Sequence, residues 1–319
     1  YPGQEHCGFP DCQGSVLQVA MGCWNCLYNY IKPKVASRFY YLISPLFPTL
    51  ASRILYWRKF KRQLNLRSPE TLNEKIMWLK LNAYNHNPLV TQCADKWRAR
   101  EYVRAMGWEG VLNEVYGVWE SAGDIPWGAL PQSFVLKCNH GCGYNLICPN
   151  KELLDIGSST QCIRKWLRTN FWRCYAEMQY RGIPKRVLCE KYLGDGGRLP
   201  RDYKVYCFHG HPLYILVCDG RGNSRPRFYF FDAEWRFCPI TQDGLEVPEG
   251  FFLEKPVNLK KMLACAADLS RPFPFVRVDF YEVDGKLIFG ELTFTPAGGL
   301  DTRRLPETDM MFGDLLKLP

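Results

Sequence analysis

The stretch "FVRVDFYEVDGKLIFGELTF" (275–294) has the composition of two apolar strands joined by a tight turn at Asp284-Gly285. Each strand carries one carboxylate in its middle, Asp279 in the first and Glu291 in the second. Carboxylates are rarely buried unless they pair with a cation or bind a metal. The hairpin therefore predicts a metal ion or a basic partner beside Asp279 and Glu291.

The composition limits what surrounds this hairpin. The chain has 319 residues, of which 47% are hydrophobic and 15% aromatic, which suits one large domain or two ordinary ones and excludes a disordered chain. The formal charge of +9, from 41 basic and 32 acidic residues, suits anionic partners such as nucleotides, polyanionic glycans or an anionic membrane face. We find no helix-turn-helix, zinc-finger or RNP pattern, so we expect no nucleic-acid partner.

The 15 cysteines fall into two groups. Eleven of them, from Cys93 to Cys265, lie mostly inside apolar runs without a framework spacing, which is typical of reduced core cysteines in a cytoplasmic protein. Zinc binding and an unstructured leader are both open interpretations of the second group, which ends in a Cys-x-x-Cys pair. That group lies within the first 26 residues and consists of Cys7, Cys12, Cys23 and Cys26.

The most apolar stretch, "FYYLISPLFPTLASRILYW" (39–57), contains Pro45, Pro48 and Arg53 and is too interrupted to span a membrane. We see no secretory signal peptide at the start and expect a cytoplasmic protein. A basic run, "RKFKRQLNLR" (58–67), follows the apolar stretch. Two interpretations stay open: an amphipathic element resting on an anionic membrane surface, and a helix docked onto the rest of the fold.

Three regions follow one another along the chain. Residues 1–36 have the character of an appendage. Residues 37–110 have a helical pattern, with a helix cap at Ser68-Pro69-Glu70-Thr71 and a further helix over 90–107. Residues 111–319 form a strand-rich region.

The sequence of the strand-rich region mostly predicts strands that follow one another as hairpins. Helical segments near 151–180 and 258–270 interrupt it. The expected strands lie within residues 111–119, 133–140, 144–149, 186–193, 202–219, 227–235, 275–283 and 286–294. Strands in this order with a few helices predict an α+β fold.

A glycine-containing turn lies between two of the expected strands, in "FVLKCNHGCGYNLI" (134–147). Lys137 ends the first strand, and Gly141 and Gly143 let the backbone approach a ligand closely. Such a turn can direct N–H groups at phosphates, and the lysine adds positive charge. An ordinary hairpin turn is the alternative.

The strand within "VLCEKYLGD" (187–195) ends in a polar linker. The backbone of Glu190, Lys191 and Leu193 can offer N–H and C=O groups to an adenine edge, and Asp195 can meet a ribose hydroxyl. The alternative is an ordinary strand end with an exposed carboxylate.

Two further lysines belong to the same series. In "DYKVYCFHG" (202–210), Asp202 and Lys204 share one face of a strand. In "CADKWRAREYV" (93–103), Lys96 lies near the expected start of a helix, where phosphate binding is favourable. Solvated surface side chains are the alternative for both motifs.

The order of these motifs resembles the ATP-grasp superfamily from about residue 90 onward. From near residue 39, the chain more closely resembles the TupA-like ATP-grasp family, which is associated with cell-surface polysaccharides and teichuronopeptide. The resemblance is carried by "RILYWRKFKRQLNLRSPETLNEKIMWLKL", "NPLVTQCADKWRAREYV", "FVLKCNHGCGYNLI", "DYKVYCF", "FPFVRVDFYEVDGKLIFGELTFTPAGG" and "PETDMMFGDLLKLP". It implies an ATP-grasp fold, in which two α+β subdomains clasp the nucleotide, here with a helical region ahead of them instead of the usual Rossmann-like domain.

The resemblance also implies a role for each motif. Phosphoryl transfer asks a protein chiefly for positioning and charge neutralisation, and Mg²⁺ takes one or two carboxylates together with substrate phosphates. Thr293 is a departure, because many ATP-grasp enzymes have asparagine there. The implied roles are ATP phosphate contacts for Lys96 and Lys137, a phosphate-covering turn with Gly141 and Gly143, adenine binding by Glu190, Lys191 and Leu193, a cleft-lining role for Lys204, magnesium binding by Asp279, Glu291 and Thr293, and charge stabilisation by Arg277.

The implied activity is that of an ATP- and Mg²⁺-dependent carboxylate–amine ligase working through an acyl phosphate. We expect a glycan- or peptide-linked acceptor, such as a uronic acid carboxylate joined to an amino acid, in polysaccharide biosynthesis. Arg303 and Arg304 lie in the loop after the strand that carries Glu291, and they are candidates to bind the substrate carboxylate. A kinase that phosphorylates a sugar and a non-catalytic nucleotide- or glycan-binding module are the alternatives.

Overall fold

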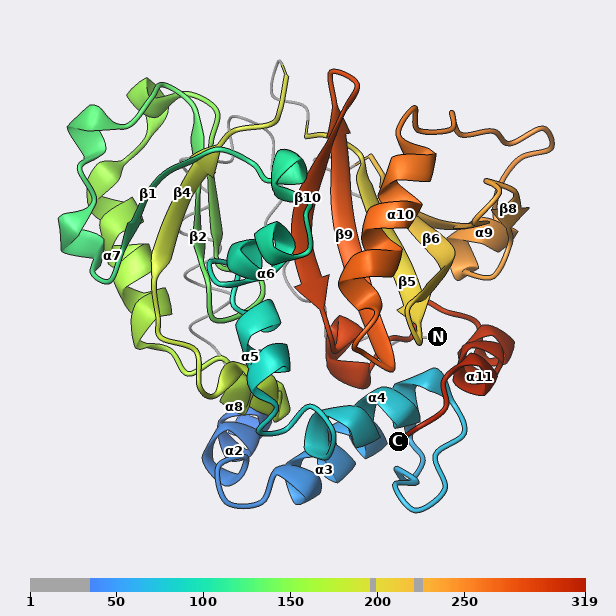
Figure 1. Ribbon diagram of the computed structural model, residues 1–319. Helices are drawn as coiled ribbons and strands as arrows, with labels where there is room; N and C mark the ends of the chain where they lie inside the picture. Colours follow the sequence, from blue (N-terminus) through green and yellow to red (C-terminus); the bar gives the residue numbers. More distant parts are fainter. Residues whose placement is uncertain (1–34, 196–198, 221–225) are drawn as a thin grey trace.

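The chain folds into two antiparallel β-sheets with helices packed against them (Figure 1). The computed structural model describes residues 35–195, 199–220 and 226–319. Each sheet contributes to its own hydrophobic core. Separate helices and antiparallel sheets around two cores confirm the predicted α+β class.

The smaller sheet holds the glycine-containing turn. Its second strand alternates buried and half-buried residues, so Phe134 and Leu136 face a core formed with helix α7. That helix contributes Ile163 and Trp166 to the same core. In spatial order the strands are β1 (Val115–Trp119), β4 (Val187–Lys191), β2 (Phe134–Cys138) and β3 (Asn145–Cys148), and the helix is α7 (Ile156–Arg168).

The larger sheet holds the hairpin at 275–294. The run predicted over 202–219 divides into two strands at His209-Gly210, where both residues have positive φ. Helix α10 (Leu259–Ser270) packs across three of the strands (Figure 1). In spatial order the strands are β10 (Lys286–Thr293), β9 (Phe275–Val283), β5 (Asp202–Phe208), β6 (His211–Asp219), β7 (Arg227–Asp232) and β8 (Phe237–Cys238).

The region ahead of the sheets is helical, as predicted. Its third helix, α4, begins with the expected cap: Thr71 accepts a hydrogen bond from the Glu74 amide, and the Glu74 carboxylate accepts one from the Thr71 amide. The helices are α2 (Val35–Ile43), α3 (Pro48–Phe60), α4 (Leu72–Leu81), α5 (Pro88–Ala94) and α6 (Ala99–Ala105). Residues of α4, α5 and α6 lie in the core of the larger sheet, and the proposed division near residue 110 stays a prediction.

The single helix predicted over 90–107 is wrong. Helix α5 ends at Ala94 and α6 begins at Ala99, because the Asp95 carboxylate accepts hydrogen bonds from the amides of Trp97 and Arg98. An aspartate that bonds its own neighbouring backbone competes with helical hydrogen bonding. Lys96 therefore lies in the turn between two helices, not on the first turn of one.

The remaining elements are short or terminal. The segment predicted as helical over 151–180 contains α7 and α8 (Trp172–Tyr175), and α9 (Gln242–Leu245) and α11 (Pro306–Leu315) complete the helices of the described residues. The 3₁₀ turns are Glu109–Val111, Ala122–Asp124, Trp127–Ala129, Lys151–Leu153, Met178–Tyr180 and Pro296–Gly299.

The cysteines of the described residues are free thiols and mostly buried, which confirms the core interpretation. The exposed exception is Cys142, in the glycine-containing turn. Within the described ranges, no helix is long and apolar enough to cross a membrane. The candidate zinc ligands lie outside the described residues: Cys7, Cys12, Cys23 and Cys26.

The C-terminal helix α11 is locked onto α4. The Lys75 ammonium donates hydrogen bonds of 2.8 Å to the carbonyl oxygens of Gly313 and Leu316, and the Asn73 side chain donates one of 2.9 Å to Asp309. A Cβ at Gly313 would lie 1.9 Å from the carbonyl oxygen of Glu70. The two chain segments therefore approach as closely as only a glycine permits.

We predict that Gly313→Ala lowers the free energy of unfolding by about 1–3 kcal/mol, because the methyl group meets rigid backbone. The measurement is urea unfolding followed by circular dichroism. Gly110→Ala is the matched control, since no atom lies within 4 Å of its Cβ, and it should change stability by less than about 0.5 kcal/mol. Equal stability of the two variants would contradict the packing described for α4 and α11.

Candidate active site

The two carboxylates of the hairpin lie directly opposite each other on β9 and β10. A β-bulge at Gly290 shifts the register by one residue, so that Glu291 pairs with Asp279 and Thr293 with Arg277. Without the shift, Glu291 would face Val278. A Cβ at Gly290 would lie 3.0 Å from the carbonyl oxygen of Asp279, so glycine suits the bulge. The bulge thus brings the polar residues of both strands onto one face.

Asp279 is the centre of a buried ion cluster. Arg277 donates to both of its carboxylate oxygens, at 2.6 and 2.7 Å. Lys204, opposite it on β5, lies 2.9 Å from the same carboxylate and 2.5 Å from Asp202. Asp279 is only 3% exposed, so its charge is compensated by protein cations instead of water. The predicted shared face of Asp202 and Lys204 is confirmed.

Glu291 has a different partner. Its carboxylate lies 3.1 Å from the Lys96 ammonium and accepts a hydrogen bond of 3.3 Å from the Thr293 hydroxyl. Burial alone would raise the pKa of Glu291, but Lys96, Arg277 and Lys204 outweigh burial and lower it to about 2. Glu291 is therefore ionised at neutral pH and available to a cation.

Lys96 is held against the glycine-containing turn. Its ammonium donates a hydrogen bond of 2.7 Å to the carbonyl oxygen of Gly141. The side-chain amide of Asn139 donates 2.8 Å to Asp95, which fixes the turn that carries Lys96. Gly143 has a φ of 78°, as a tight turn requires. The predicted phosphate lysine and the predicted phosphate turn therefore lie side by side.

Gly141 is needed for a packing reason. A Cβ there would lie 2.5 Å from the ring of Phe171. Cys142, which follows it, is exposed. The turn therefore packs against Phe171 at Gly141 and is exposed to solvent at Cys142.

Lys137 and Glu190 form an ion pair of 2.7 Å across β2 and β4. Burial lowers the pKa of Lys137, but Glu190 outweighs it and keeps the lysine charged. The main chain of Lys191 donates to Glu114 and accepts from Asn113. The Glu190 side chain thus positions Lys137, and the Lys191 N–H is engaged within the protein.

The rest of the proposed adenine linker follows β4. Leu193 is half-buried, and Asp195 is exposed. Their roles toward adenine and ribose stay predictions.

Sequence reasoning missed a second buried network at the end of β10. The Thr295 hydroxyl donates to Glu177 at 2.5 Å and accepts from Gln179 at 2.7 Å. Lys80, fully buried on α4, donates to the carbonyl oxygens of Tyr175 and Gly298. Burial lowers the pKa of Lys80 to about 8, against the opposing pull of Glu177. In the sequence, the only indication of this network is that Thr295 continues the alternating polar positions of Glu291 and Thr293.

One predicted substrate contact is wrong. Arg304 is 4% exposed and forms ion pairs with Asp301 at 2.9 Å and with Asp309 at 3.0 Å. Its guanidinium therefore supports the loop after β10 and is not free for a substrate carboxylate. Arg303 is exposed, with its guanidinium 4.3 Å from the centre of the Phe228 ring.

The donor set fits Mg²⁺ but not a metal held by protein alone. In the part of the chain that the structure describes, no three His, Cys, Asp or Glu side chains gather as a metal-binding group. Asp279 and Glu291 supply two opposed carboxylates, with the Thr293 hydroxyl beside them. Mg²⁺ is commonly held by one or two carboxylates together with phosphate oxygens and water. The geometry therefore suits a magnesium ion that arrives with a phosphorylated ligand.

The chain has similarities to proteins of known structure and to a described protein family. No curated protein matches the chain. Among solved structures, the chain resembles D-alanine–D-alanine ligase from Bacillus anthracis, with 18% identity, a TM-score of 0.43, and coverage of 70% of this chain and 64% of that one. It also resembles an L-amino acid ligase from Bacillus licheniformis, with 12% identity, a TM-score of 0.45, and coverage of 80% and 58%.

The alignments thus span less than two thirds of each of these two ligases. A family model described as TupA-like ATPgrasp matches residues 74–317. That match takes in both sheets and every residue proposed to bind the nucleotide or magnesium, and it exceeds half of the chain. The protein belongs to the TupA-like ATP-grasp family.

Proposed function

We propose that the protein is an ATP- and Mg²⁺-dependent carboxylate–amine ligase. The observation that carries the proposal is the polar face of β9 and β10, where Asp279 and Glu291 are opposed in register and contacted by Arg277, Lys204 and Lys96. Two carboxylates paired with lysine and arginine side chains form a face on which a metal and phosphates could replace the existing ion pairs. Family membership supports the same reading.

The proposed reaction has two steps. The γ-phosphoryl group of ATP passes to a carboxylate oxygen of the first substrate, which gives an acyl phosphate and ADP. An amine then attacks the acyl carbon, so that a C–N bond forms, phosphate leaves and the amine proton passes to solvent. Mg²⁺, held by Asp279 and Glu291 with Thr293 beside them, would neutralise charge on the transferring phosphates.

The side chains and backbone N–H groups of the protein are proposed to bind the phosphates and to stabilise negative charge. Lys96 and Lys137 bind phosphate oxygens, and the turn with Gly141 and Gly143 covers them with backbone N–H groups. Lys204 lines the phosphate side of the site. Arg277 stabilises negative charge that develops on the transferring phosphoryl group or on the tetrahedral intermediate.

The nucleotide base is proposed to lie along the linker after β4. Main-chain groups of Glu190, Lys191 and Leu193 face adenine, and Asp195 meets the ribose. Since the Lys191 N–H already donates to Glu114, the hydrogen bonds to adenine fall mainly to its neighbours.

The substrates are proposed from the family and from the charge of the chain. We propose that the carboxylate belongs to a glycan or uronic acid, that the amine belongs to an amino acid or peptide, and that the product serves polysaccharide biosynthesis in the cytoplasm. The support is the resemblance to the TupA-like family and the net charge of +9, which suits polyanionic acceptors.

A trapping assay tests the reaction class. Hydroxylamine replaces the unknown amine and converts any acyl phosphate into a hydroxamate, which is read by its ferric complex alongside ADP release. We expect hydroxamate with at least one uronic acid or carboxylated oligosaccharide, and only when ATP and Mg²⁺ are present. ADP release with a neutral sugar and no hydroxamate would indicate the kinase alternative. ATP binding without turnover on any acceptor would favour the non-catalytic module.

We predict that Asp279→Asn and Glu291→Gln each lower kcat by orders of magnitude, because each removes a proposed magnesium ligand. The measurement is ADP release under saturating ATP, with thermal unfolding as a check that the variants fold. Asp284→Asn, an exposed carboxylate at the tip of the same hairpin, is the matched control and should keep full activity. Normal turnover in the Asp279/Glu291 double variant would refute the magnesium assignment.

We also predict that Mg²⁺ and nucleotide bind cooperatively. In the free protein the Lys96 ammonium lies 3.1 Å from Glu291, and Lys204 and Arg277 contact Asp279, so Mg²⁺ alone must compete with these cations for the two carboxylates. A nucleotide supplies phosphates to receive them. Calorimetry should therefore detect Mg²⁺ binding at least tenfold tighter with a non-hydrolysable ATP analogue than without it, a coupling of about 1.4 kcal/mol or more.

The variant Lys96→Met gives a second test of the same exchange of ion pairs. It removes the cation that competes for Glu291, so Mg²⁺ alone should bind more tightly to this variant than to the wild type. Equal Mg²⁺ affinity in the presence and absence of nucleotide would exclude the exchange of lysines for metal.

A further inference from the structure

The helices α2 and α3 expose an unusual number of large apolar side chains. Six of the 14 exposed large hydrophobic residues of the described chain lie between residues 39 and 57. Leu42 and Leu46 are 69% and 77% exposed. We name this set the α2–α3 face, and its apolar members are Phe39, Leu42, Leu46, Phe47, Leu50 and Trp57.

The face lies on the solvent side of a helix that is otherwise well docked. On α3, the residues Ala51, Ser52, Leu55 and Tyr56 are buried against the protein. Leu50, Arg53 and Trp57 recur at helical spacing on the opposite side and are exposed. One side of α3 is therefore docked onto the protein, as one of the two interpretations of the sequence expects, and the other side is exposed. The membrane-surface interpretation stays a prediction.

The chain segment that carries this face has basic residues and no acidic ones. Residues 35–67 contain no aspartate or glutamate. Their basic residues are Arg38, Arg53, Arg58, Lys59, Lys61, Arg62 and Arg67. Lys61 lies 5.6 Å from the centre of the Trp57 ring, so one cation stands directly beside an exposed aromatic side chain. Apolar side chains bordered by lysine and arginine match the boundary of an anionic lipid bilayer, where rings and acyl chains mix below charged headgroups.

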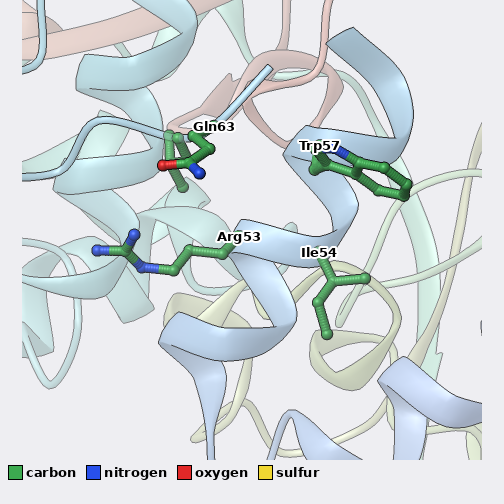
Figure 2. Close-up of a pocket in the computed structure, with 5 residues that line it drawn as sticks. Arg53, Ile54, Trp57 and Gln63 are labelled. Carbon is green, nitrogen blue, oxygen red and sulfur yellow. The ribbon is translucent and has the colours of Figure 1, made fainter. Parts of the chain in front are cut away.

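A shallow groove of about 310 Å³ opens on the same helix. Figure 2 shows Arg53, Ile54 and Trp57 projecting from α3, with Gln63 of the following segment nearby. The groove pairs a guanidinium with apolar walls, a combination that accepts a lipid phosphate next to its first acyl carbons. Helices α2 and α3 and the short segment between them lie apart from the strands that carry the proposed site residues (Figure 1).

We propose that the α2–α3 face docks the protein onto the surface of an anionic membrane. The apolar side chains enter the headgroup region, and the basic side chains bind lipid phosphates. This inference does not depend on the ligase reaction, and it gives the enzyme a fixed orientation toward any lipid-linked acceptor.

The experiment is co-sedimentation of the full chain with vesicles of phosphatidylcholine alone and of phosphatidylcholine with 30% phosphatidylglycerol. We expect binding to the anionic vesicles, weakened by salt, and little binding to the neutral ones. Phe47→Ser with Trp57→Ser should weaken binding roughly tenfold or more, since two rings no longer enter the bilayer. Lys59→Glu with Lys61→Glu should weaken it by a similar factor.

Matched controls lie elsewhere on the surface. Phe252→Ser with Leu245→Ser alters residues that are 75% and 63% exposed and should leave vesicle binding unchanged, as should Lys260→Glu with Lys286→Glu. If the ligase proposal holds, ADP release in the absence of vesicles stays normal in every variant. Failure of lipid binding with normal ADP release would refute this inference alone.

Three outcomes would overturn the proposal. If residues 1–34 cover the face, the wild-type chain stays in the supernatant with both kinds of vesicle. If a second copy covers it, light scattering shows a dimer that the Phe47/Trp57 variant loses, again without lipid binding. Equal binding to neutral and anionic vesicles would exclude the anionic surface.

Discussion

A balance of three buried or half-buried anions against three cations governs the centre of this protein. Asp202, Asp279 and Glu291 are matched by Lys204, Arg277 and Lys96. Removing one member leaves a poorly solvated charge without a partner, which typically costs several kcal/mol. The surrounding structure therefore has to hold three strands and one helix–helix turn in a fixed relation. The Gly290 bulge, the Asn139–Asp95 hydrogen bond and the buried Lys80 each serve that relation.

The same balance explains how a site with so few potential ligands can serve a metal. Among the described residues two opposed carboxylates form the site, and the neighbouring cations keep Glu291 ionised. A ligand that brings its own metal and its own anions can replace one set of ion pairs with another at little electrostatic cost. The ion pair of Lys137 and Glu190 extends this arrangement onto the smaller sheet, so both sheets contribute cations to the proposed phosphate region.

Local chemistry in the sequence predicted the hairpin turn at Asp284-Gly285, the Thr71 cap and the strands that carry charged residues. The sequence also contains a sign of the bulge. The apolar residues Leu287 and Phe289 occupy odd-numbered positions, whereas Leu292 and Phe294 occupy even-numbered ones, so the apolar face changes by one residue between them. The break at Asp95 was missed, since helical periodicity outweighed the capping tendency of a single aspartate. Glu177 and Lys80 gave no local signal, as their roles depend on partners far along the chain. The same holds for Arg304, whose burial by Asp309 is set by the docking of α11.

The docking of the N-terminal helices has a consequence for how the chain is made. Lys80 hydrogen-bonds to the carbonyl oxygen of Gly298, 218 residues later, and Lys75 to that of Leu316, 241 residues later. At translation rates of about 5–20 residues per second, α4 leaves the ribosome roughly 10–40 s before Gly298 is synthesised. During that interval its apolar side and its lysines lack their native partners. Helix α4 is therefore among the last elements to be fixed in place, because its docking waits until residues 298–316 have been synthesised.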